Sequence, residues 1–288
     1  MSGKTISTMA GPYIAVFDSG VGGLTVLAEL LKAYPKHSFL YLGDTARVPY
    51  GTRSSELVIR YALEAEWFLT RYPLDCFVIA CNTVSAVALT ALHAATPNIT
   101  ILDVITPGAQ AAVDATTTGK IMVVATEGTI ASHAYEKAIH ALEPEAEVIG
   151  IPCPLLVSLA EEGVISGSIP ESIIRYYIEE RLAQDSEIDT IVLGCTHFPL
   201  LKPVFKKIVG DSIHVVDSAL PLVHRLKPYL TPTTENSRPR LRMFTTDLPE
   251  RFMRIGAAFL ERPLEEPTLL DLESMYSNHH RQYQNENY

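Results

Sequence analysis

The chain has 288 residues, of which 47% are hydrophobic, so it is long enough for two modest domains and can bury a core without disulfides or metals. Its 33 acidic and 23 basic side chains give a net charge of -10, which disfavours nucleic-acid binding because that needs concentrated Lys and Arg. No apolar stretch approaches the roughly 18 to 20 residues that span a bilayer, and the first residues lack a signal-peptide core. We therefore expect a cytoplasmic protein without nucleic-acid or membrane partners.

The predicted elements alternate between short apolar strands and amphipathic helices. In chain order, strands are expected at 13–17, 37–42, 75–80, 98–103, 120–125, 147–151, 188–194, 213–217 and 240–245. Helices are expected at 23–34, 54–71, 83–95, 107–115, 130–142, 155–162, 170–184, 199–209, 219–229 and 249–261. This alternation predicts parallel sheets covered by helices on both faces, with the functional residues at the carboxyl ends of the strands.

An internal similarity indicates a duplicated half. The segment LDCFVIACNT aligns with IDTIVLGCTH, so that Cys81 falls on Cys195 at an offset of 195 − 81 = 114 residues. The same offset places Asp103 on Asp217 in the next strand. The alternative is that all strand-helix-strand units look alike. If the halves are related by a pseudo-twofold axis, the two thiols can face each other across a cleft.

The fold class we predict is α/β, with two pseudo-symmetric doubly wound domains, mainly parallel sheets and an active-site cleft between the domains. The first domain is expected to comprise residues 11–104 plus 217–265, and the second residues 105–216. Residues 266–288 are expected to form a polar C-terminal tail.

The chain contains four cysteines, Cys76, Cys81, Cys153 and Cys195. They are too few for a disulfide scaffold and lack the CxxC spacing of zinc sites, so we expect free thiols and no bound metal. Cys76 falls within a predicted strand and Cys153 in a predicted loop, where a thiol is usually a small buried hydrophobe.

Cys81 and Cys195 have a different setting, because each ends an apolar strand and precedes a helix. Free backbone N–H groups and the helix dipole at such a position are expected to lower the pKa of a thiol from about 8.5. The adjacent Asn82, Thr83 and Thr196 can donate hydrogen bonds to a bound carboxylate. A single such cysteine could simply be buried, but the matched pair favours a chemical role.

The segment AVFDSGVGGLT ends another strand and carries Asp18 and Ser19 before a glycine-rich helix entry. Glycines let backbone N–H groups approach an anion closely. The glycine spacing does not fit a dinucleotide fingerprint, and no phosphate loop is present, so a small carboxylate is the better ligand. Alternatively, Asp18 and Ser19 only cap the helix.

Two further segments place polar groups at strand ends. LGDTARVPYG ends in the turn formed by Pro49, Tyr50 and Gly51, whose ordinary role is to connect elements. VVATEGT carries Thr126 and Thr129, which can offer hydroxyls to a substrate at the cleft or cap the following helix.

One histidine and two glutamates complete the set of candidates. His197 lies two residues after Cys195 and is a plausible proton partner for it, although a histidine at a helix start is often a cap. Glu161 and Glu162 lie near a predicted helix end, where acids are usually only solvated.

Together these residues resemble the glutamate racemases, within the aspartate/glutamate racemase superfamily. The match covers roughly residues 12 to 262. The paired cysteine motifs alone would indicate the superfamily, and the DSG and PYG segments narrow it to the glutamate enzymes. The motifs that carry the resemblance are FDSGVGGLTV (17–26), GDTARVPYG (43–51), ACNTVSA (80–86), CPLLVSLAEEG (153–163) and LGCTHFPLL (193–201).

The resemblance implies a role for each matched residue. Cys81 and Cys195 would be the catalytic acid/base groups, with Asp18 assisting Cys81 and with His197 and Glu161 assisting Cys195. Glu161 is preferred to its neighbour because it falls eight residues after the cysteine of its motif, as in the family. Asp44 would support the site. The residues implied to hold the ammonium and the two carboxylates are Ser19, Pro49, Tyr50, Gly51, Asn82, Thr83 and Thr196.

The implied reaction interconverts L- and D-glutamate without a cofactor, and its D-glutamate would supply peptidoglycan synthesis. Cys81 would take the α-proton from the D-isomer and Cys195 from the L-isomer, since one rigid base cannot easily reach both faces of the α-carbon. A homodimer is compatible with this assignment. The alternatives are a racemase of aspartate or another small carboxylate, a non-catalytic amino-acid sensor, and a thiol hydrolase that uses Cys195 and His197.

Overall fold

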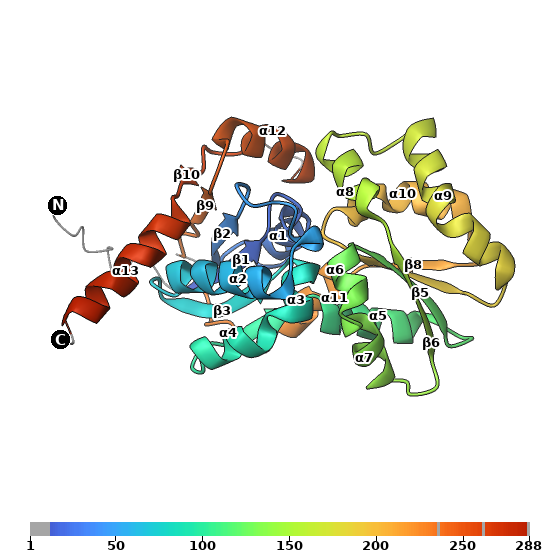
Figure 1. The fold of residues 1–288 in the computed structure, drawn as a ribbon, viewed down its shortest axis with the longest axis horizontal. Coiled ribbons are helices and arrows are strands. Elements are labelled where there is room, and N and C mark those ends of the chain that lie inside the picture. The colour runs from blue at the N-terminus through green and yellow to red at the C-terminus, as the bar shows by residue number, and fades with distance from the viewer. Residues whose placement is uncertain (1–11, 235–236, 261–262, 287–288) are drawn as a thin grey trace.

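The computed structural model describes residues 12–234, 237–260 and 263–286, and these residues form two parallel β-sheets with helices around each (Figure 1). Three of the sequence-based expectations fall outside the described residues. They concern the start of the first domain at residue 11, the opening residues in which we looked for a signal-peptide core, and residues 287–288 of the tail. Within the described residues, no helix combines the length and the apolar character that crossing a bilayer requires.

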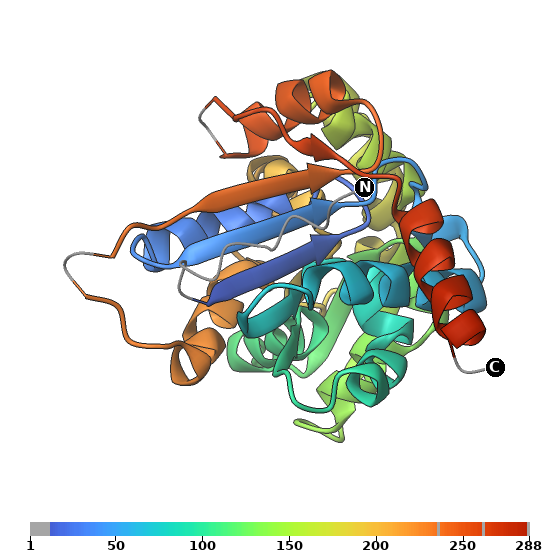
Figure 2. The ribbon, with the colours of Figure 1, turned by 90° about the vertical axis from the view of Figure 1, so that its left-hand side faces the viewer.

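The first sheet has six strands and the second has four. The first runs in the order β10 (Thr268–Leu269), β9 (Leu241–Thr245), β2 (Ser38–Gly43), β1 (Tyr13–Asp18), β3 (Leu74–Ile79) and β4 (Ile101–Asp103). The second runs in the order β6 (Glu147–Pro152), β5 (Lys120–Ala125), β7 (Thr190–Gly194) and β8 (His214–Val216). Neighbouring strands are parallel throughout, and Figure 2 shows β9, β2 and β1 side by side in one direction.

The two sheets share one topology. The order β2-β1-β3-β4 in the first sheet corresponds to β6-β5-β7-β8 in the second. In this correspondence β3, which precedes Cys81, matches β7, which precedes Cys195, as the offset of the repeat requires. The predicted α/β class with two pseudo-symmetric parallel-sheet domains is therefore confirmed.

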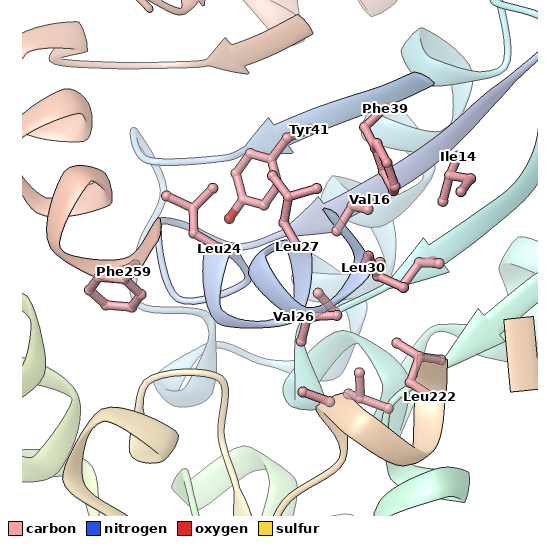
Figure 3. Packing of buried hydrophobic residues seen from close by; sticks show 14 of the residues in the cluster. Ile14, Val16, Leu24, Val26, Leu27, Leu30, Phe39, Tyr41, Leu222 and Phe259 are labelled. Carbon is pink, nitrogen blue, oxygen red and sulfur yellow. The ribbon is translucent and has the colours of Figure 1, made fainter. Parts of the chain in front are cut away.

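Helices cover both faces of the first sheet, which explains why its strands are apolar at nearly every position. Along β1, Ile14 and Val16 face one core, whereas Ala15 and Phe17 face the other. Figure 3 shows the first of these cores, where Leu27 lies among the labelled residues. The first core includes residues of α1 (Leu24–Ala33), α11 (Ala219–Leu226) and α12 (Pro249–Leu260). The second includes residues of α2 (Ser55–Leu69), α3 (Asn82–Val87), α4 (Leu89–Ala95) and α13 (Leu272–Glu286).

The second sheet is covered in the same way. One core includes residues of α8 (Pro154–Glu161), α9 (Ser168–Gln184), η2 (Phe198–Leu201) and α10 (Lys202–Val209). The other includes residues of α5 (Ile105–Ala115) and α7 (Ala134–His140). The remaining short elements are η1 (Tyr50–Thr52), α6 (Glu127–Ala131) and η3 (Lys227–Tyr229).

The chain exchanges helices between the domains. Helix α5 follows β4 of the first sheet, yet Ile105 and Ala109 pack in a core of the second sheet. Helix α11 follows β8 of the second sheet, yet Leu222 and Leu226 pack in a core of the first. This packing supports boundaries near residues 104 and 216, and the division into domains stays a proposal.

Residues 266–286, which the sequence analysis assigns to a polar tail, contain β10 and α13. Strand β10 pairs with the end of β9, and α13 packs against α2, where the rings of Trp67 and Tyr276 lie 5.6 Å apart. Two predicted helices are also interrupted. Residues 83–95 form α3 and α4 on either side of Ala88, and α7 is preceded by α6, with His133 in a left-handed conformation (φ 56°) between them.

Candidate active site

The carboxyl ends of the two sheets line one small cavity of about 40 Å³ between the domains. Both Cys81 and Cys195 belong to its wall. The residues from the first domain are Ser19, Val48, Pro49, Tyr50, Gly51, Cys81, Asn82 and Thr83. Those from the second are Thr126, Val157, Glu161, Cys195, Thr196 and His197. The structure thus brings most of the sequence-predicted site residues together, while Asp18, Asp44 and Thr129 lie beneath the lining residues that they contact.

Cys81 follows β3 and is the N-cap residue of α3. Its thiol donates a long hydrogen bond to the hydroxyl of Ser19, with 3.5 Å between Sγ and Oγ. Burial, followed by the nearby charge of Asp18, raises the pKa of Cys81 to about 12, although hydrogen bonds with Ser19 and Val84 act to lower it. The expectation of a lowered pKa is therefore wrong for Cys81, because loss of solvent outweighs the N–H groups of a short helix.

Asp18 ends β1 and is completely buried. One carboxylate oxygen accepts a hydrogen bond from the backbone N–H of Gly20 at 2.9 Å, and the other accepts one from the hydroxyl of Thr196 at 3.3 Å. Burial raises the pKa of Asp18, while the charge of His197 opposes that rise. Because Thr196 follows Cys195 in the second domain, this hydrogen bond connects Asp18, which lies near Cys81, to the segment that carries Cys195.

Cys195 follows β7 and faces the imidazole of His197, whose Nδ1 lies 3.7 Å from Sγ. The other ring nitrogen, Nε2, lies 3.3 Å from Oε1 of Glu161, within ion-pair distance but without the alignment of a hydrogen bond. Burial alone would lower the pKa of His197, but Cys195 and Glu161 outweigh it and raise that pKa to about 10. The imidazole is therefore positively charged at neutral pH.

The two neighbouring glutamates differ in their surroundings. The carboxylate of Glu161 lines the cavity beside His197, and this contact lowers the pKa of Glu161. Glu162 has 64% of its side chain exposed, and its carboxylate contacts Arg251, which Glu161 also contacts. The geometry therefore favours Glu161 as the partner of His197.

Asp44 organises the loop that carries Pro49, Tyr50 and Gly51. It is completely buried and accepts hydrogen bonds from Nε of Arg47 at 2.7 Å and from the hydroxyl of Tyr50. Its other oxygen accepts one from Thr246 at 2.7 Å. These contacts hold Tyr50 in the cavity wall, which suits a supporting role for Asp44.

Three threonine hydroxyls meet where the domains adjoin. Oγ1 of Thr126 lies 3.0 Å from Oγ1 of Thr83 and 3.0 Å from Oγ1 of Thr129. Nearby, Oδ1 of Asn82 accepts a hydrogen bond from the hydroxyl of Tyr135 at 2.8 Å, which leaves its amide nitrogen as the group able to donate. This part of the wall is rich in hydroxyl and amide groups, which suit a carboxylate ligand.

Comparison with known proteins agrees with this geometry. The model of the family described as Asp/Glu/Hydantoin racemase matches residues 18–226. The chain belongs to this family. A glutamate racemase from Geobacter metallireducens is 44% identical over 267 residues, covering 91% of this chain and 97% of the relative. The resemblance to glutamate racemases inferred from the motifs is confirmed.

Solved structures show the same relationship. A glutamate racemase from Francisella tularensis, crystallised with D-glutamate, has a TM-score of 0.83 at 34% identity and covers 91% of this chain and 98% of its own. A glutamate racemase isoform from Bacillus anthracis has a TM-score of 0.85 at 38% identity, with the same coverage.

Several residues in or near the site were not predicted from the sequence. Val48 and Val157 line the cavity, and Tyr135 contacts Asn82 from beneath it. Arg47 lies in the GDTARVPYG motif three residues after Asp44, and this spacing could have predicted the ion pair that the two residues form. Arg251 lies far along the chain on α12, where nothing in the local pattern marks it.

Two further features bear on ligands. Among the residues that the structure describes, no group of three or more His, Cys, Asp or Glu side chains could hold a metal ion. A larger cavity of about 680 Å³ lies beside β9, where Arg240 and Arg242 are among its lining residues. We place the candidate site at the smaller cavity, because the thiols and their charged partners converge there.

Proposed function

We propose that this chain interconverts L- and D-glutamate, with Cys81 and Cys195 as the two acid/base groups. The observation that carries the proposal is that the two thiols line one cavity from different domains. Each thiol also has its own polar partners, Ser19 for Cys81 and His197 for Cys195. The substrate is proposed because the similar proteins are glutamate racemases, one of them crystallised with D-glutamate.

The charges around the thiols support a defined proton path from the L-isomer. The high pKa of Cys81 keeps it a thiol, and the positive imidazole of His197 stabilises negative charge on the sulfur of Cys195. Cys195 as thiolate breaks the α-C–H bond and takes the proton, leaving the electron pair on the substrate. Cys81 then gives its proton to the opposite face. The D-isomer reacts in reverse, with the roles of the thiols exchanged.

The hydrogen-bond donors of the cavity wall would hold the substrate. Negative charge develops on the α-carboxylate as the proton leaves, so aimed N–H and O–H groups lower the barrier most. Asn82, Thr83 and Thr196 lie next to the thiols and suit this carboxylate, whereas the second carboxylate suits the segment of Tyr50 and Gly51 with Thr126. These assignments extend the family resemblance to individual residues.

The biological role follows from the product. D-glutamate made by this reaction would supply peptidoglycan synthesis in the cytoplasm, and the reaction as proposed needs no cofactor. A homodimer stays a prediction.

The direct test is substitution of each thiol, with the optical rotation of L-glutamate as the readout and no cofactor added. Cys81→Ala and Cys195→Ala are each expected to abolish racemisation. Cys76→Ala is the matched control, because Cys76 is a buried thiol of the same strand that ends before Cys81, yet it lies in the core. Racemisation by either site variant would refute the two-thiol mechanism, and faster turnover of L-aspartate would refute the substrate.

A further inference from the structure

The contacts of Cys195 continue beyond His197 and Glu161 to a residue of the other domain. Arg251 lies on α12, which packs on the first sheet, whereas Glu161 ends α8 of the second. Nη2 of Arg251 lies 3.3 Å from Oε2 of Glu161 and donates a hydrogen bond to it. The arginine therefore reaches across the boundary between the domains.

The two oxygens of Glu161 have different partners. Oε1 faces Nε2 of His197 at 3.3 Å, and Oε2 faces Arg251 at the same distance. A carboxylate held on one side only can rotate about its last bond, whereas contacts on both sides define its orientation. Glu161, the carboxylate that faces His197, is thus positioned by the charge of Arg251, which does not line this cavity.

We infer that Arg251 is a positioning residue for the reaction: it holds Glu161 from the opposite domain so that the carboxylate stays directed at His197 beside Cys195. This inference rests on the proposed function. It also implies that Cys195 and His197 have their full set of partners only when α12 of the first domain lies against α8 of the second. A second residue of α12 also reaches the site: the ring of Phe259, two turns after Arg251, contacts the imidazole of His197 edge to face, with 6.0 Å between the ring centres.

The charges around Glu161 give the expected pH dependence. The close contact with charged His197 lowers the pKa of Glu161, burial opposes this effect, and the charge of Arg251 lowers that pKa further. The other charged groups near Glu161 are Glu162, which shares Arg251, and Asp247, which lines the neighbouring small cavity. Without Arg251 the carboxylate becomes protonated at higher pH, and protonation removes the negative partner of His197.

The experiment compares kcat/KM between pH 5 and 9 for Arg251→Met, Arg251→Lys and a matched control, Arg254→Met. Arg254 is an exposed arginine nearly one turn further along the same helix. Arg251→Met is expected to lower kcat/KM at neutral pH by about tenfold and to move the acidic limb to higher pH. Arg251→Lys should restore most of the activity, and Arg254→Met should match the unmodified chain.

Two outcomes would overturn the inference. One is unchanged kcat/KM in Arg251→Met. The other is a loss of kcat/KM by the same factor at every pH. A change in folding alone would give that result, because it lowers the amount of active protein and leaves the acidic limb of the pH profile in place. Thermal unfolding of each variant measures the contribution of folding. Failure of the proposed function is recognised separately, since either the unmodified chain would not racemise glutamate or Cys81→Ala and Cys195→Ala would remain active.

Discussion

Substitution of Gly22 by alanine tests how the first domain shapes the site of the second. Gly22 is buried just before α1, and it abuts the segment that follows Cys195. A Cβ atom at this position would lie 2.3 Å from Oγ1 of Thr196 and 2.6 Å from the imidazole ring of His197. Both neighbours are buried, so neither can move freely into solvent.

The required displacement sets the expected magnitude. Ordinary contacts of a Cβ atom begin at 3.4 Å, so the hydroxyl of Thr196 must move by about 1 Å. A shift of that size at catalytic groups lowers kcat/KM by about 100-fold. Overpacking of a buried site also costs about 1–3 kcal/mol of unfolding free energy. We therefore expect Gly22→Ala to lose most of its activity while still folding.

The assay is racemisation of L-glutamate together with unfolding by urea. Gly210→Ala is the matched control, because Gly210 has a positive φ of 69° but no atom within 4 Å of the added Cβ. Strain at Gly210 costs about 1 kcal/mol, so this control loses stability and keeps its activity. Unchanged activity in Gly22→Ala, or an equal loss in both variants, would refute the reasoning.

Three further predictions follow from the charged and buried groups. Glu161→Gln should lower kcat/KM by about 100-fold, whereas Glu162→Gln should not, because only Glu161 faces His197; equal losses would contradict this assignment. Tyr50→Phe removes one donor from buried Asp44 and should cost about 1–3 kcal/mol of unfolding free energy in urea, and an unchanged midpoint would contradict it. Folding raises the pKa of His197 from 6.5 to about 10, so its stabilisation is complete below pH 6.5 and is lost as pH rises through 10. The difference in unfolding free energy between the unmodified chain and His197→Gln should therefore shrink over that range, and a difference that grows would contradict the charged imidazole.

The strands and the position of the two thiols were predictable from the sequence. Apolar runs buried on both faces, such as the one that ends at Cys81, carry a strong local signal, and the offset to Cys195 relates the two halves. The polar residues that follow these strands were predictable for the same reason, since the carboxyl ends of parallel strands meet at one edge. Asn82 and Thr196 lie at the cavity accordingly.

Features that depend on contacts distant in sequence were not predictable in this way. The pKa of Cys81 depends on burial and on Asp18, which only the assembled fold brings near it. Arg251 reaches Glu161 across 90 positions of sequence, so no local pattern marks the pair. Helix α13 reads as a polar tail because its sequence is mostly polar, and the burial of Leu272 and the packing of Met275 against the same core appear only in the assembled fold.

The fate of the α-proton tests the central claim most directly. L-glutamate is incubated with the chain in D2O, and both isomers are recovered at low conversion and analysed by mass spectrometry. If separate thiols remove and return the proton, the D-glutamate carries one deuterium while the recovered L-glutamate remains protonated. Rapid appearance of deuterium in the recovered L-glutamate, before D-glutamate accumulates, would indicate a single exchanging base and contradict the account.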